Sequence, residues 1–192
     1  MNNIAIFASG NGSNAQAIIT YFREHSTRSR VSLVVTNRPD AYVVARASDL
    51  GVETLCWGRE VFCDSPEVVV SALSSRNIGF VVLAGFMLLI PPQIINSFRG
   101  RIINIHPSLL PEFGGRGMYG DRVHRAVIDS GERVSGISIH LIDEHYDRGD
   151  LIFQAQTALC PGETPESLAQ KIHALEHYHY PRVIERLIET KE

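Results

Sequence analysis

Short apolar runs rich in β-branched residues alternate with segments of helical periodicity along the first half of the chain. The pattern predicts strands over residues 4–8, 31–36, 52–56, 80–84 and 101–105. It predicts helices over 14–24, 41–50, 66–76 and 94–98, with Ser65 as an N-cap and Pro66 in the first turn. The run over 80–84 is apolar throughout, as expected for a strand buried on both faces. This alternation predicts a doubly wound, mostly parallel α/β sheet.

The second half of the chain has a different pattern. Residues 107–121 carry two prolines and four glycines and predict a long irregular segment, which in a compact domain is usually functional or disordered. A helix over 122–129 follows, and then two strands over 134–142 and 151–158 flank an acidic loop. We expect these strands to form an antiparallel pair. A long helix over 165–188 comes last, with a kink expected at Pro181. No repeat or linker divides the chain, so we expect one domain over 1–192.

The composition limits the classes of function. The chain has 192 residues, 44% of them hydrophobic and 20% charged, with a formal net charge of −3 and a pI near 6.2. That charge argues against a nucleic-acid binder that tracks phosphates. The longest apolar stretch, residues 80–92, is too short to span a bilayer, and the N-terminus lacks the features of a signal peptide. Cys56, Cys63 and Cys160 show no CxxC spacing, which is typical of reduced cytosolic thiols. We therefore expect a cytoplasmic protein.

Two polar residues end the predicted strand over 101–105. Asn104 and His106 stand two positions apart, so their side chains should point to the same side of the strand. Pro107 has no backbone N–H and should end the strand there. An amide beside an imidazole can stabilise a developing oxyanion and move a proton. Taken alone, the pair is more simply explained as a solvated strand end.

A glycine-containing turn joins the first strand to the first helix. Gly10 and Gly12 allow a sharp turn, and the helix that follows presents free N–H groups, which together favour one phosphate. A tight turn without a ligand is the alternative. The segment also satisfies the loose dinucleotide fingerprint, which requires an acidic residue at the end of the next strand. Asn37 and Arg38 stand there instead, which argues against a nicotinamide cofactor.

A third loop follows the buried strand over 80–84. It begins at Gly85 and continues through apolar residues, so it is either part of the core or the wall of a pocket for a flat ligand. In an open parallel sheet, ligands bind at the carboxyl edge. The loops over 9–14, 85–90 and 104–107 all follow predicted strands, so we expect them to meet at this edge.

Three further groups of residues deserve a prediction. The acidic loop over 143–150 could bring a carboxylate beside His106, although its pattern does not distinguish one acid from another. The histidines of the last helix do not form an HExxH motif, so we expect Glu176 and a histidine to line a pocket or form surface ion pairs, and we expect no metal. Ser13 lacks the GxSxG context of a hydrolase nucleophile.

These segments resemble the phosphoribosylglycinamide formyltransferase family. Phe7-Ala-Ser-Gly-Asn-Gly-Ser-Asn14 is similar to its phosphate loop, and Leu83-Ala-Gly-Phe-Met87 and Asn104-Ile-His-Pro-Ser-Leu-Leu-Pro111 to its central motifs. Gly136-Ile-Ser-Ile-His140, Asp147-Arg-Gly149 and the pairs 176–177 and 180–181 follow in the family's order. The resemblance covers nearly the whole chain and implies a Rossmann-like formyltransferase fold.

The resemblance implies an activity and a set of site residues. The activity is transfer of a formyl group from 10-formyltetrahydrofolate to the amine of 5′-phosphoribosylglycinamide, in purine biosynthesis. Asn104 and His106 would stabilise the tetrahedral intermediate and assist proton transfer, and Asp147 would raise the pKa of His106. The substrate would be held by Gly12, Ser13, Asn14 and Glu176. The folate would contact Met87, Leu88, Leu89, Ile90 and Asn104, largely through backbone groups. The partners would be these two small molecules, with no nucleic acid or membrane.

Some positions depart from the family pattern. Pro66 and Leu88 stand where arginines are usual, and His173 occupies a Gln/His-type position one turn before Glu176. The segment over 113–120 is a longer version of the loop after the formyl-transfer motif and could act as a substrate lid.

Three other functions compete with this interpretation. Methionyl-tRNA formyltransferase adds a C-terminal tRNA domain, and formyltetrahydrofolate hydrolase adds an N-terminal regulatory domain. We expect neither domain, and no fusion to other purine enzymes, from the length of this sequence. A sugar-phosphate binding module could use the glycine loop alone, but it would not need Asn104, His106 and Asp147 together.

Overall fold

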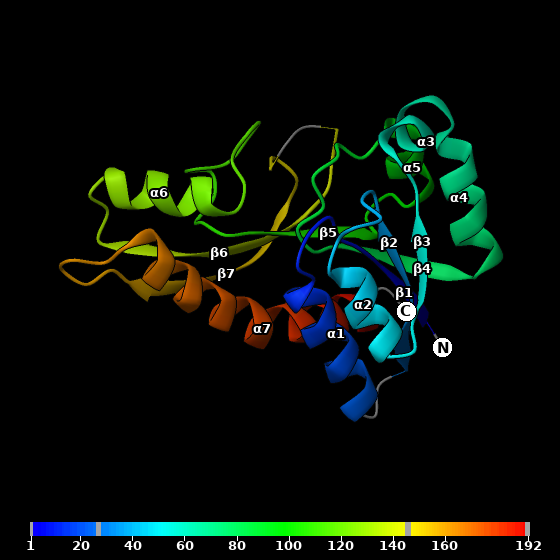
Figure 1. Cartoon of the computed structure of the whole chain (residues 1–192), viewed down its shortest axis with the longest axis horizontal. Coiled ribbons are helices and arrows are strands. Elements are labelled where there is room, and N and C mark those ends of the chain that lie inside the picture. Colours follow the sequence, from blue (N-terminus) through cyan, green and yellow to red (C-terminus); the bar gives the residue numbers. More distant parts are fainter. Residues whose placement is uncertain (1, 26–27, 145–146, 191–192) are drawn as a thin grey trace.

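The computed structural model describes residues 2–25, 28–144 and 147–190, and its seven strands form one sheet (Figure 1). The strands are β1 (Asn2–Phe7), β2 (Ser29–Thr36), β3 (Glu53–Cys56), β4 (Ile78–Leu83), β5 (Ile102–His106), β6 (Val134–Leu141) and β7 (Leu151–Ala158). Their order across the sheet is β3-β2-β1-β4-β5-β6-β7. The pairs from β3 to β5 are parallel, and β6 runs antiparallel to both β5 and β7. The mostly parallel sheet with an antiparallel pair in the C-terminal half is confirmed.

Helices cover both faces of the sheet. They are α1 (Ser13–Glu24), α2 (Val43–Asp49), α3 (Arg59–Asp64), α4 (Pro66–Ser75), α5 (Pro92–Ser97), α6 (Asp121–Asp129) and α7 (Pro165–Glu189). One buried cluster joins α1, α2, α6 and α7 to the sheet, and a second joins α3, α4 and α5 to its other face (Figure 1). Successive residues of β1 alternate between these clusters, because side chains alternate along a strand. This two-sided burial explains why the central strands are almost continuously apolar.

The predicted elements agree with the structure to within two residues, and only α3 was missed. Helix α3 was not predicted, because its six residues bury only Phe62 and show little periodicity. Strand β4 begins at Ile78, two residues earlier than predicted, and ends at Leu83. Ser65 is the N-cap residue of α4, as predicted, but its side chain makes no capping hydrogen bond.

Helix α7 is attached to the two central strands through Tyr180. This side chain is fully buried, and its hydroxyl lies 2.9 Å from the carbonyl oxygen of Leu83 and 3.1 Å from that of Ile103. The hydroxyl hydrogen is therefore donated to carbonyls of both β4 and β5. Helix α7 continues as a helix through Pro181, and the kink expected there stays a prediction. Since β4 and β5 lead into two of the predicted site loops, this contact fixes α7 relative to them.

No helix within the described residues has the length and apolar character that crossing a membrane requires.

Candidate active site

The loops that follow β1, β4 and β5 meet at the carboxyl edge of the sheet, as predicted. They line a cavity of about 620 Å³, a volume suited to small-molecule ligands. The irregular segment before α6, the loop after β6 and one side of α7 complete its wall. The lining residues are 10–14, 83–90, 104–107, 115–120, 122, 124, 142, 143, 147, 173 and 176. Every predicted site residue is among them.

The turn between β1 and α1 has the backbone geometry of a helix N-terminus. Gly12 is the N-cap residue with φ 78°, a left-handed conformation that favours glycine. A Cβ atom on Gly12 would lie 2.5 Å from Cγ2 of Val43, so the first turn of α2 also excludes a larger residue. The first turn of α1 contains no acidic residue. The partial positive charge of the helix end is therefore available to an anion at Gly12, Ser13 and Asn14.

Ser9 joins the loops after β1, β2 and β4. Its side chain is almost fully buried, and its hydroxyl donates to Oδ1 of Asn37 over 2.5 Å. The same hydroxyl accepts a hydrogen bond from the backbone N–H of Met87 over 2.9 Å, and the Ser9 N–H donates to the carbonyl of Gly85. The predicted phosphate loop and the predicted folate loop are thus held together.

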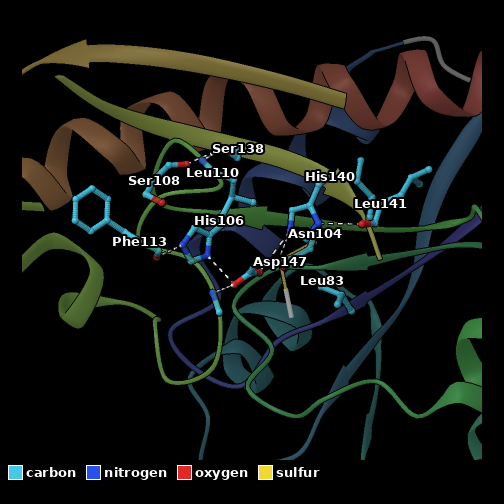
Figure 2. A network of polar contacts seen from close by, with 12 residues as sticks. Leu83, Asn104, His106, Ser108, Leu110, Phe113, Ser138, His140, Leu141 and Asp147 are labelled. Atoms are coloured by element: carbon cyan, nitrogen blue, oxygen red, sulfur yellow. Dashed lines mark hydrogen bonds and ion pairs between the residues drawn. The ribbon is translucent and has the colours of Figure 1, made fainter. Parts of the chain in front are cut away.

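The side chains of Asn104, His106, Asp147 and His140 form one polar cluster beside the cavity (Figure 2). Oδ2 of Asp147 lies 3.6 Å from Nδ1 of His106, and its Oδ1 lies 3.6 Å from Nε2 of His140. The backbone N–H of Gly115 donates to Oδ2 of Asp147 over 2.9 Å. Asp147 has φ 52°, a left-handed conformation in the loop between β6 and β7. Its neighbours His145 and Tyr146 lie outside the described residues.

Hydrogen bonds define the neutral tautomers of both histidines. Nε2 of His106 lies 2.8 Å from the carbonyl oxygen of Phe113, which can only accept, so Nε2 carries the hydrogen. This leaves Nδ1, which faces Asp147, as the nitrogen that gains or loses a proton. In His140, Nδ1 donates to the carbonyl of Leu141 over 2.9 Å, and Nε2 accepts from Nδ2 of Asn104 over 3.1 Å.

Burial controls the pKa of His106. His106 is 3% exposed, and this burial lowers its pKa below the ordinary value by more than the negative charge of Asp147 and the Phe113 carbonyl raise it. Asp147 therefore raises the pKa of His106, as expected, but burial outweighs this effect and the net pKa is lowered. The pKa of Asp147 itself is lowered, because contacts with His140, His106 and the Gly115 N–H outweigh its burial.

Glu176 lies on α7 and lines the same cavity. Its carboxyl group is 6% exposed and accepts a hydrogen bond from Nδ2 of Asn14 over 2.9 Å. Burial raises the pKa of Glu176 to about 7, although the Asn14 hydrogen bond opposes the shift. Glu176 therefore holds a proton to higher pH than an ordinary glutamate does.

The histidines of α7 are not arranged as a metal site. His173 lines the cavity with Glu176, as predicted, and its ring lies parallel to that of His177 at 6.2 Å between centroids. His179 packs against Phe153 instead. Within the described residues, no group of three or more His, Cys, Asp or Glu side chains is placed to hold a metal ion.

Comparison with known proteins agrees with this geometry. A model of the formyl transferase family matches residues 2–184. The phosphoribosylglycinamide formyltransferase of Bacillus subtilis is 35% identical over 98% of this chain and 95% of its own length. The crystal structure of phosphoribosylglycinamide formyltransferase from Bacillus halodurans is 36% identical, with a TM-score of 0.90 over 100% of this chain and 97% of that one. This chain belongs to the phosphoribosylglycinamide formyltransferase family.

Other members of the family are longer. The chloroplastic phosphoribosylglycinamide formyltransferases of Arabidopsis thaliana and Vigna unguiculata are 38% and 39% identical to this chain. In both comparisons the match covers 98% of this chain, which spans 66% and 61% of the length of these two relatives. The resemblance to this family that was inferred from the sequence is confirmed. The fold of this chain is also the fold of that family.

Leu88 and Pro66, which depart from the family pattern, lie in different parts of the structure. Leu88 lines the cavity and packs against the second core cluster, between Met87 and Leu89, which are 49% and 46% exposed. Ile90 is nearly buried. Pro66 is buried at the start of α4 and does not line the cavity. The side chain of Pro66 therefore does not contact a ligand in this cavity.

The irregular segment over 107–121 is held in place near its start and in its middle. Ser138 of β6 donates to the carbonyl of Ser108 over 2.7 Å and accepts from the N–H of Leu110 over 2.8 Å (Figure 2). In the middle of the segment, the N–H of Gly115 donates to Asp147. Residues 115–120 line the cavity, as a substrate lid would require. That this segment opens and closes stays a prediction.

Two polar residues of the site were not predicted. His140 was noted only as part of a family motif, yet it pairs with Asn104 in the register of β5 and β6 and so lies beside it. His124 of α6 lines the cavity, is 3% exposed, and its Nδ1 has no hydrogen-bond partner among the described residues. Only the pairing of β5 with β6 and the packing of α6 reveal these positions.

Proposed function

We propose that this chain transfers the formyl group of 10-formyltetrahydrofolate to the amine of 5′-phosphoribosylglycinamide, in purine biosynthesis. One observation carries the proposal: the N-terminus of α1, which has no acidic residue in its first turn, and the Asn104–His106–Asp147 cluster line the same cavity. A module that only binds a sugar phosphate would need the helix N-terminus but not the polar cluster. Membership of the phosphoribosylglycinamide formyltransferase family supports the same activity.

The substrate is bound on the side of α1 and α7. The N–H groups at Gly12, Ser13 and Asn14 hold the phosphate at the start of α1, where the helix dipole is favourable. The carboxyl group of Glu176 accepts a hydrogen bond from the glycinamide portion of the substrate and positions it. Since Asn14 already donates to Glu176, one hydrogen-bonded pair connects the phosphate end to the amine end.

The folate is bound on the side of β4. Residues Met87, Leu88, Leu89 and Ile90 form an apolar wall whose backbone N–H and C=O groups pair with the pterin ring. The exposed side chains of Met87 and Leu89 cover the ring faces. Asn104 lies where the formyl group meets the amine, so it contacts both the cofactor and the reaction centre.

The reaction is an attack of the amine on the formyl carbon, and it produces a tetrahedral intermediate with a negatively charged oxygen. One hydrogen of the Asn104 amide is held by His140, which leaves the other to donate to that oxygen. Nδ1 of His106 accepts the proton that the amine loses and later gives it to the folate nitrogen. The charge of Asp147 stabilises the imidazolium formed in between. No step in this sequence requires a metal ion.

The chain forms one formyltransferase domain that acts in the cytoplasm, with these two small molecules as its partners. The three free cysteines, Cys56, Cys63 and Cys160, are all exposed, which supports a reducing compartment.

A spectrophotometric assay tests the proposed function. Deformylation of 10-formyltetrahydrofolate, or of its dideaza analogue, is followed with and without phosphoribosylglycinamide. We expect deformylation that depends strictly on the amine. Equal deformylation without the amine would identify a hydrolase, and no deformylation in either case would leave only a binding module.

A further inference from the structure

Helix α2 makes hydrogen bonds to the phosphate loop, mainly through Arg46. Nε of Arg46 donates to the carbonyl oxygen of Asn11 over 2.9 Å, and Nη2 donates to Oδ1 of the same residue over 2.9 Å. Nη1 donates to Oε1 of Gln16 in α1. The planar guanidinium group thus binds the backbone and the side chain of Asn11 at once, through a rigid fork of donors.

Arg46 lies on the outer side of this loop. It lines a shallow hollow between α1 and α7, and it is not among the residues that line the main cavity. Gly10, Asn11 and Gly12 do line the main cavity. The loop therefore separates Arg46 from the space in which a phosphate would bind, so Arg46 acts on a ligand through the loop.

The carbonyl that Arg46 holds belongs to the same peptide unit as the N–H of Gly12. In a trans peptide unit the C=O and the N–H point in opposite directions. Holding the Asn11 carbonyl toward Arg46 therefore turns the Gly12 N–H away from Arg46, to the side of the cavity. This N–H donates no hydrogen bond to any acceptor among the described residues, so it is free for a ligand.

A second contact from α2 acts in the same way on the preceding peptide unit. The N–H of Val43 donates to the carbonyl of Gly10 over 3.1 Å, which turns the N–H of Asn11 toward the opposite side. Close packing of Val43 on Gly12 leaves the loop little room to change its conformation. Two carbonyl oxygens that would repel an anion are in this way kept away from the cavity.

We propose that Arg46 is a positioning residue for the substrate phosphate, because it fixes the Asn11–Gly12 peptide unit so that the Gly12 N–H points at the phosphate. This inference rests on the proposed function only for the identity of the whole substrate. The ligand feature that it concerns is a phosphate monoester, which can be tested by itself. Arg46 contacts no reacting atom, so it affects binding and leaves the chemical step unchanged.

The variants Arg46→Lys and Arg46→Met separate peptide orientation from charge. Lysine keeps the positive charge but lacks the rigid planar fork that fits the two oxygens of Asn11, and methionine has neither the charge nor the fork. The matched control is Arg23→Met, because Arg23 also joins α1 to α2, through the carbonyl of Leu50, but does not contact the phosphate loop.

The experiment measures the Kd for ribose 5-phosphate by calorimetry and the steady-state constants with both substrates. Loss of one hydrogen bond to a charged group corresponds to a weakening of roughly tenfold or more. Both Arg46 variants should raise the Kd and the KM for phosphoribosylglycinamide about tenfold, with kcat and the KM for the folate within about twofold. Arg23→Met should match the unmodified protein, and thermal denaturation should confirm that all variants are folded.

Three results would overturn the inference. Normal binding in Arg46→Lys with weak binding in Arg46→Met would assign the effect to charge alone. A fall in kcat at unchanged KM would place Arg46 in the chemical step, and unchanged Kd values in both variants would remove Arg46 from phosphate binding. If the unmodified protein binds ribose 5-phosphate but transfers no formyl group, the proposed function fails, while the comparison of Kd values still tests Arg46.

Discussion

The side-chain amide of Asn14 donates a hydrogen bond to the carboxyl group of Glu176 over 2.9 Å, although 162 positions separate the two residues. Asn14 belongs to the first turn of α1, and Glu176 lies in the middle of α7. The contact joins the phosphate loop at the start of the fold to its last helix. It also places a nearly buried carboxyl group in a cavity that we propose binds an anion and an amine.

The pKa of Glu176 predicts how stability depends on pH. Its pKa is raised by burial to about 7, against 4.5 for an ordinary glutamate, so between these values only the folded protein keeps the proton. The contribution of Glu176 to the free energy of unfolding is therefore complete below pH 4.5 and is lost as the pH rises to 7, by roughly 3 kcal/mol.

The variant Glu176→Gln removes this titration. Urea unfolding without substrate, measured from pH 4.5 to 7.5, should show that the unmodified protein loses stability relative to the variant across this window. Glu67→Gln, at an exposed position in the first turn of α4, controls for loss of a carboxyl group. A stability difference between the unmodified protein and Glu176→Gln that stays constant over the window would mean that Glu176 is not protonated near neutral pH.

His106 is predicted to act in the chemical step. The substitution His106→Ala removes the group that transfers protons, so kcat should fall by roughly 10²- to 10⁴-fold with a small change in KM. His179→Ala is the matched control, since His179 packs against Phe153 away from the cavity and should keep normal kcat. Steady-state kinetics would contradict the assigned role if His106→Ala kept kcat within a few fold of normal.

Asp147 is predicted to set the pH dependence of turnover through His106. Its negative charge raises the pKa of His106 against the larger effect of burial. Asp147→Asn should therefore lower this pKa further, so the acid limb of the kcat profile should move to lower pH while kcat itself falls. Asp150→Asn, at an exposed position in the same loop, should leave the profile in place. A shift of the limb to higher pH would exclude this electrostatic role.

Gly12 is predicted to be irreplaceable for steric and conformational reasons. Gly12→Ala would place Cβ 2.5 Å from Cγ2 of Val43 in a residue with φ 78°, and strain of this kind costs about 1–3 kcal/mol. The control is Gly10→Ala, because a Cβ atom on Gly10 meets no atom within 4 Å. Chemical denaturation of the two variants tests the difference, and equal stability would show that the loop adjusts freely.

The central part of the site could be predicted from the sequence because it depends on strand geometry. Asn104 and His106 share a face of β5, and Pro107 ends the strand, so alternation alone brought the two side chains together. The three site loops could be placed together because they follow parallel strands of one sheet. These inferences need only local patterns and the general rule for α/β folds.

The rest of the site depends on contacts that no local pattern contains. Asp147 is one of several acids in a turn, and only its left-handed backbone and the Gly115 hydrogen bond place it beside His106. His140 is adjacent to Asn104 through the pairing of β5 with β6. The net shift of the His106 pKa could not be predicted either, because it depends on how completely the imidazole is buried.

Transfer of labelled carbon distinguishes formyl transfer to the amine from hydrolysis and from binding without reaction. The protein is incubated with phosphoribosylglycinamide and 10-formyltetrahydrofolate carrying ¹³C in the formyl group, and the products are followed by NMR. We expect the label to appear as an N-formyl group on the glycinamide nitrogen, at a rate that His106→Ala reduces strongly. Label released as free formate, or label that stays on the folate, would contradict it.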